Sequence, residues 1–71
     1  MKSVHALTFN GLLITVFHHS LLALAKEALT TSEVQDYLAD IKISEDEFID
    51  IVLKNDMFDN FEIFTVFVAD D

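Results

Sequence analysis

The sequence predicts a small α+β domain in which a β-hairpin is followed by three helices and a final strand, in the order ββαααβ. Three observations predict it: an Asn-Gly dipeptide between two apolar runs, two helix-start signals in the acidic middle of the chain, and a C-terminal run rich in β-branched and aromatic residues. We expect a three-stranded, mostly antiparallel sheet packed on helices. The 71 residues are enough for one domain, 1–71.

The first expected element is a hairpin with strands over 3–9 and 12–18. Asn-Gly favours a two-residue type I′ turn, because both central residues of that turn need positive φ. Such a turn sets His5 opposite Val16. The hairpin face expected to enter the core carries Leu7, Phe9, Leu12, Ile14 and Val16.

A competing interpretation of this region is one helix over 12–29. The succession Ile-Thr-Val-Phe at 14–17 disfavours it, since β-branched and aromatic side chains suit strands better than helices. We therefore expect a shorter helix over 21–29, with Ser20 as its N-cap. Only two of its residues are charged, which predicts a largely buried helix.

Two acidic helices are expected next, over 31–41 and 45–55. The patterns Thr-x-x-Glu at 30–33 and Ser-x-x-Glu at 44–47 fit the capping box, in which each side chain bonds a backbone N–H that the helix leaves without a partner. At 100° per residue the acids gather on one side of each helix, opposite an apolar side. The expected buried sides carry Val34, Leu38 and Ile41 on the first helix, and Phe48, Ile51 and Val52 on the second.

These acids are the candidate partner-binding residues: Glu33, Asp36, Asp40, Glu45, Asp46, Glu47 and Asp50. The first three span about 10 Å at 1.5 Å per residue, which is comparable to two phosphate steps along a nucleic-acid strand. A row of carboxylates at this spacing could occupy a basic groove made for nucleic acid. The alternative is that the acids are ordinary solvated residues that keep the chain in solution.

The final strand is expected over 61–69 and is apolar on both faces. A strand of this kind is either central in a sheet that is covered on both sides or lies at an interface. The candidate dimer or docking surface comprises Phe61, Ile63, Phe64, Val66 and Phe67.

Charge limits the partners of this chain. Its net charge is −9, and all 13 acids lie in 27–71, together with only two of the four lysines. Such a surface repels phosphate and attracts basic proteins, so neither direct nucleic-acid binding nor membrane binding is expected. The longest apolar run, 12–25, is shorter than the roughly 20 residues that span a bilayer. With no cysteine, the chain is compatible with the cytoplasm.

No pattern in the sequence predicts catalysis, a cofactor or a metal. There is no cysteine nucleophile and no Gly-rich phosphate loop. His5 and His18 share a face of the expected hairpin, but two ligands without a third are weak evidence for a metal site. The polar residues at 56–62 lack the spacing and the glycine of an EF-hand.

The helices at 31–41 and 45–55 and the strand after them resemble a helix-turn-helix with part of its wing. The resemblance covers about half of the chain and rests on the order of elements alone. Such a domain meets DNA through basic or amide side chains on its second helix, where this chain carries acids, so DNA binding is not expected.

In size and charge the chain also resembles the acidic inhibitors of phages and mobile elements, anti-CRISPR proteins among them. We therefore expect an acidic module that inhibits or sequesters a basic, nucleic-acid-handling partner as a nucleic-acid mimic. One alternative is an assembly protein that forms a homodimer or docks through the final strand. Another is an antitoxin or immunity protein.

Overall fold

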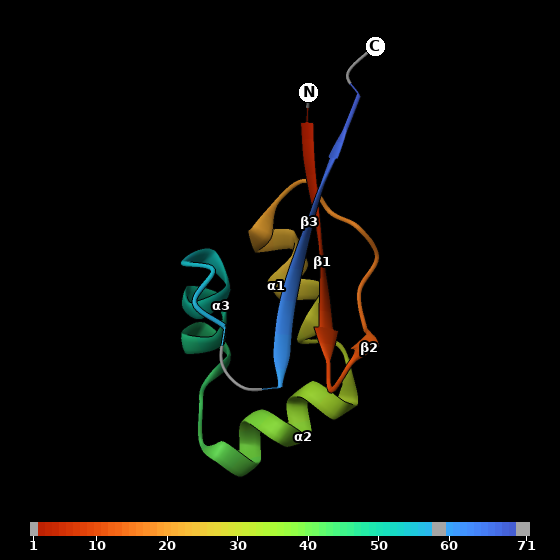
Figure 1. The fold of residues 1–71 in the computed structure, drawn as a ribbon. Helices are drawn as coiled ribbons and strands as arrows, with labels where there is room; N and C mark the ends of the chain where they lie inside the picture. Colours follow the sequence, from red (N-terminus) through yellow and green to blue (C-terminus); the bar gives the residue numbers. More distant parts are fainter. Residues whose placement is uncertain (1, 58–59, 70–71) are drawn as a thin grey trace.

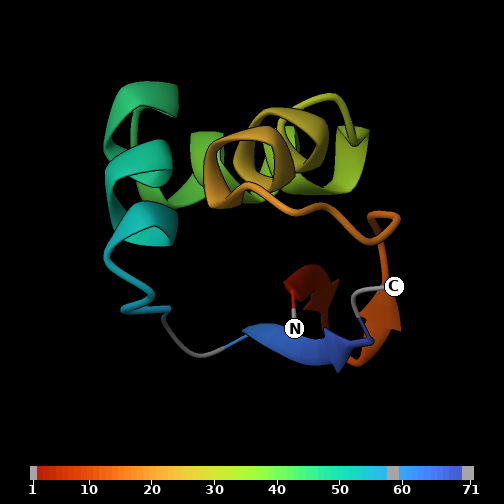
Figure 2. The same cartoon turned by 90° about the horizontal axis from the view of Figure 1, so that it is seen from above.

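The computed structural model describes residues 2–57 and 60–69, and it confirms the ββαααβ order. The elements are β1 (Lys2–Phe9), β2 (Leu12–Leu13), α1 (Leu21–Ala28), α2 (Ser32–Ile41), α3 (Glu45–Leu53) and β3 (Phe61–Val68). The strands form one antiparallel sheet in the order β2-β1-β3. All three helices lie on the same side of this sheet, as the two views in Figures 1 and 2 show.

The hairpin turn has the expected geometry. Asn10 and Gly11 both have positive φ, 53° and 81°, and Phe9 faces Leu12 across the turn. Only residues that tolerate the left-handed region can form this turn, which is why the dipeptide predicts it.

The second strand is much shorter than predicted, because β2 ends at Leu13. The backbone of 14–18 bulges, and His5 pairs with His18 rather than with Val16. The buried hydroxyl of Thr15 accepts the Leu7 N–H at 2.9 Å, in place of a backbone carbonyl. The extra residues in the bulge turn side chains outward. The expected core face was therefore wrong at Val16, which is 62% exposed. It was also wrong at Leu12, which is 71% exposed although it pairs with Phe9 in the expected register, because β2 lies at the edge of the sheet.

The final strand lies at the edge of the sheet. β3 pairs with β1 along its whole length, from Phe9↔Phe61 to Lys2↔Val68. It is therefore not central, which was one of the two alternatives for a strand that is apolar on both faces. The strand between two neighbours is β1, whose residues 6–9 are all buried.

Serines begin two of the helices as expected. The Ser20 hydroxyl accepts the Ala23 N–H, and the Ser44 hydroxyl accepts the Glu47 N–H at 3.1 Å. The capping box expected at Thr30 was wrong. The Thr30 hydroxyl donates to the Glu27 carbonyl at the end of α1, and the N-cap of α2 is Thr31, whose side chain makes no capping bond.

The core lies between the sheet and the helices. Phe48 of α3 is fully buried, and an aromatic cluster joins the two layers. Phe61 lies 4.6 Å from Phe9 and 5.4 Å from Phe48 between ring centroids, and Tyr37 of α2 lies 5.1 Å from Phe9. These rings hold both acidic helices on the sheet, so the outer sides of α2 and α3 have a fixed position.

Candidate functional site

The seven candidate acids all lie exposed on α2 and α3. Behind them, Val34 and Leu38 of α2 and Phe48 and Val52 of α3 are buried, as the helical periodicity predicts. Ile41 was expected on the buried side of α2 but is 36% exposed, because it lies at the last position of the helix. A short connection, residues 42–44, joins the end of α2 to the start of α3 (Figure 1), so the two acidic helices are consecutive in the chain.

Few cations neutralise this surface. Asp50 forms an ion pair with Lys54 at 2.9 Å, one helical turn along α3, and the Asp50 hydrogen bond raises the pKa of Lys54. Among the described residues, Asp50 is the only one of the seven candidate acids that forms an ion pair. The other carboxylates are available to the basic groups of a partner.

Helix stability accounts for some of these acids and not for others. Glu33 lies in the first turn of α2, and Glu45, Asp46 and Glu47 lie in the first turn of α3, where a negative charge stabilises the helix dipole. Asp40 lies in the last turn of α2, where the dipole disfavours it by about 0.3–1 kcal/mol, and that turn contains no basic residue.

A shallow hollow of about 470 Å³ adjoins the acidic surface at the start of α2. Its lining is formed by Phe9, Asn10, Leu12, Leu13, Ile14, Thr31 and Glu33. Glu33 is the only charged residue of this lining. The hollow is thus an apolar site with one carboxylate beside it. It lies at the start of the stripe on α2, the name used below for the exposed acids Glu33, Asp36 and Asp40.

The candidate docking surface on β3 divides into two parts. Phe61 is buried in the core and Ile63 packs partly against it. Side chains alternate between the two faces of a strand, so Phe64 and Val66 lie on the face opposite to that of Phe61 and Ile63, which the helices leave open. Phe67 is 68% exposed. The exposed apolar surface of the strand therefore extends from Phe64 to Val68.

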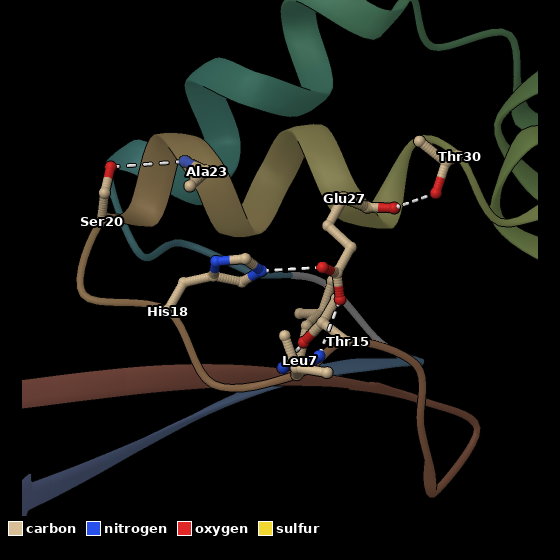
Figure 3. Close-up of polar contacts among 8 residues, drawn as sticks. Leu7, Thr15, His18, Ser20, Ala23, Glu27 and Thr30 are labelled. Atoms are coloured by element: carbon tan, nitrogen blue, oxygen red, sulfur yellow. Dashed lines mark hydrogen bonds and ion pairs between the residues drawn. The ribbon is translucent and has the colours of Figure 1, made fainter.

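Glu27 of α1 is a structural residue that the sequence did not single out. Its carboxylate accepts the Val16 N–H at 2.7 Å and lies 2.9 Å from His18 Nε2, so that it joins the bulged segment 14–18 to α1 (Figure 3). The backbone bond from Val16, followed by the bond to His18, lowers the pKa of Glu27. One sequence signal was present, since Glu27 is the first acid of the chain.

The rings of His5 and His18 have different partners. His5 and His18 are paired through their backbones, but His5 Nδ1 lies 2.9 Å from the Thr65 hydroxyl whereas the His18 ring contacts Glu27. The described residues contain no group of three or more His, Cys, Asp or Glu side chains that could hold a metal ion. Asp59, one of the polar residues at 56–62, lies outside the described residues.

No helix in the described part of the chain has the length and apolar character needed to cross a membrane. Comparison with protein-family models, with curated proteins and with solved structures finds no match to this chain.

Proposed function

We propose that this chain binds a basic surface of a nucleic-acid-handling protein through the carboxylates of α2 and α3, and so keeps nucleic acid from that surface. The observation that carries the proposal is the set of exposed carboxylates on two consecutive helices, α2 and α3. Among the described residues, Asp50 is the only one of these carboxylates with a cation partner. Long-range attraction to a basic surface would speed association and orient the two proteins.

The position of Asp40 supports a role in binding. Surface acids that serve only solubility have no reason to lie where the helix dipole opposes them, and acids at a helix start stabilise the fold by themselves. Asp40, together with Asp36 one turn earlier on the same exposed side, extends the row begun by Glu33 along α2. The row follows the helix axis, as phosphates follow a strand.

The apolar hollow beside Glu33 gives the surface a second kind of contact. Interfaces gain most of their affinity from a few well-packed anchor residues, and charges outside them mainly steer association. A partner segment with an apolar or aromatic side chain next to an arginine or lysine would fill the hollow and pair with Glu33. Leu12 and Leu13, both more than half exposed, form part of its rim.

The experiment is affinity capture from the lysate of a native host, with the full chain as bait at low and at high salt. The test variant carries Asp36→Asn and Asp40→Asn, which preserve side-chain size and remove two charges. The matched control carries Asp56→Asn and Glu62→Gln, which remove two charges from exposed positions outside the stripe on α2. Circular dichroism verifies that both variants are folded.

We expect a basic protein to be captured by the wild type and by the control and to be lost from the test variant. Captured protein should elute as salt shortens the Debye length, and a DNA or RNA competitor should displace it. Equal capture by both variants would refute the proposal, and so would a captured partner that nucleic acid does not displace.

A further inference from the structure

Strand β3 leaves one edge of the sheet open. Within the described residues it pairs with β1 alone, whereas the opposite edge consists of a two-residue strand and the bulged segment 14–18. Proteins protect exposed edges with short strands, bulges, lysines or prolines. β3 has none of these features: it has eight residues, contains neither lysine nor proline, and keeps an unbroken register with β1. Figure 1 shows its C-terminal half running past the helices.

The open edge presents backbone groups at alternate positions. Asn10 and Asn60 face each other just beyond the last pair of the ladder, Phe9↔Phe61. Asn10 donates its N–H to the Asn60 carbonyl at 2.8 Å, so Asn10 and Asn60 are a hydrogen-bonded pair. Bonded and non-bonded pairs alternate along an antiparallel ladder, so the even-numbered residues of β3 bond to β1. The N–H and C=O groups of Ile63, Thr65 and Phe67 therefore point away from β1, towards the open edge.

The sequence of β3 is complementary to itself about Thr65. An antiparallel copy in that register faces Ile63 with Phe67, Phe64 with Val66, and Thr65 with Thr65. Aromatic pairs with β-branched residues, and threonine pairs, are among the cross-strand pairs that stabilise sheets. None of these five residues is buried, so all are open to such a contact.

The charges of the strand are compatible with the same register. No side chain from Ile63 to Val68 is charged, so a chain with net charge −9 can meet its own copy there without facing carboxylates. The register places Val68 opposite the second copy's Glu62, and Lys2 of β1 lies on the other side of Val68. Lys2 and the second copy's Glu62 then lie on one face of the sheet about 10 Å apart, which is two strand spacings. The twofold axis creates this arrangement twice.

From this geometry we propose that two copies of the chain pair antiparallel through the open edges of their β3 strands, with the twofold axis at Thr65. The two three-stranded sheets become one continuous sheet, and the helices of both copies lie on the same side of it. The occupant of the open edge is therefore a second copy of this chain.

Sedimentation equilibrium of the full chain over a range of concentrations tests the proposal. Thr65 is exposed, so charges are tolerated there in the monomer. Thr65→Lys and Thr65→Glu each place like charges opposite each other on the twofold axis, and we expect each to weaken dimerisation roughly tenfold or more. A mixture of the two variants should dimerise again, because lysine then faces glutamate.

Two controls separate this pairing from other contacts. Thr65→Val removes the bond to His5 without adding charge and should leave the dimer intact. Leu13→Lys alters the sheet face that the helices leave open and should also leave it intact. A monomeric wild type at high concentration would overturn the proposal. It would also be overturned by a Lys/Glu mixture that stays monomeric, or by a dimer that Leu13→Lys abolishes and Thr65→Lys does not.

Discussion

Replacing Glu27 tests whether a single carboxylate holds the bulged segment 14–18 against α1. In the folded protein this carboxylate bonds the Val16 N–H at 2.7 Å and the His18 ring at 2.9 Å. Glu27→Ala removes both bonds, whereas Glu27→Gln removes the charge and retains one acceptor and one donor group. The two substitutions therefore separate the contribution of the charge from that of the hydrogen bonds.

The expected loss of stability follows from the two hydrogen bonds of Glu27. Hydrogen bonds to a charged group contribute about 1.5–3 kcal/mol each, and neutral ones about 0.5–1.5 kcal/mol. The His18 and Glu27 side chains are 24% and 32% exposed, which favours the lower value for each bond. We expect Glu27→Ala to lower the free energy of unfolding by about 3 kcal/mol, and Glu27→Gln to lower it by about half of that. A domain of this length has a free energy of unfolding of about 4–10 kcal/mol, so Glu27→Ala should be severely destabilised.

Acid should abolish the difference in stability between the wild type and Glu27→Gln. The pKa of Glu27 is lowered below its ordinary value of 4.5 in the folded protein, so folding favours the charged form. The stabilisation is therefore fully present above about pH 4.5 and is lost as the pH falls through the lowered folded-state pKa. The difference in free energy of unfolding between wild type and Glu27→Gln should shrink over that range.

Urea denaturation followed by circular dichroism, repeated across this pH range, measures the effect. The matched control is Glu62→Gln, which removes the same charge from an exposed strand residue whose side chain makes no hydrogen bond within the described part of the chain, and which should change stability by less than about 0.5 kcal/mol. If Glu27→Gln proves as stable as the wild type at neutral pH, or if the difference persists in acid, the attribution to the Glu27 carboxylate is wrong.

Three further predictions concern the turn, the caps and the core, each measured by the same denaturation assay. Ser44→Ala should lower the free energy of unfolding by about 1 kcal/mol, because the Ser44 hydroxyl caps α3. Thr31→Ala should lower it by less, because Thr31 makes no capping bond, and equal losses would contradict this assignment. Gly11→Ala should lose about 1 kcal/mol, since φ is +81° there although a Cβ meets no atom within 4 Å; an unchanged midpoint would show that the turn rearranges. Phe48→Ala should lose about 3–5 kcal/mol, the cost of a cavity at a fully buried ring; a loss below 1 kcal/mol would mean that the core collapses around it.

Features that depend on neighbouring residues were predictable from the sequence. The Asn10-Gly11 turn, the caps at Ser20 and Ser44, and the exposed acids of α2 and α3 all depend on residues within about one turn of the chain, and the structure confirms each of them. The element order follows from the same local signals. The use of these acids in binding stays a prediction, because exposure alone does not identify a partner.

Features that depend on distant residues were not predictable. The bulge at 14–18 depends on two contacts: the Thr15 hydroxyl accepts the Leu7 N–H, and the Glu27 carboxylate of α1 accepts the Val16 N–H. No periodicity in 12–18 indicates either contact. Thr30 fitted a capping box, but in the structure its hydroxyl donates to the Glu27 carbonyl, since two adjacent threonines compete for two adjacent helix ends.

The sequence by itself determined the order of the helices and strands and the sign of the surface charge, because each residue's propensity and charge act locally. Only the tertiary structure decided that the final strand lies at the edge. An apolar strand carries the same pattern in a central position as at an edge, and the difference arises when β1 pairs with residues from the far end of the chain. That pairing leaves the backbone groups of Ile63, Thr65 and Phe67 directed outward, in a strand whose only charged residue is Glu62.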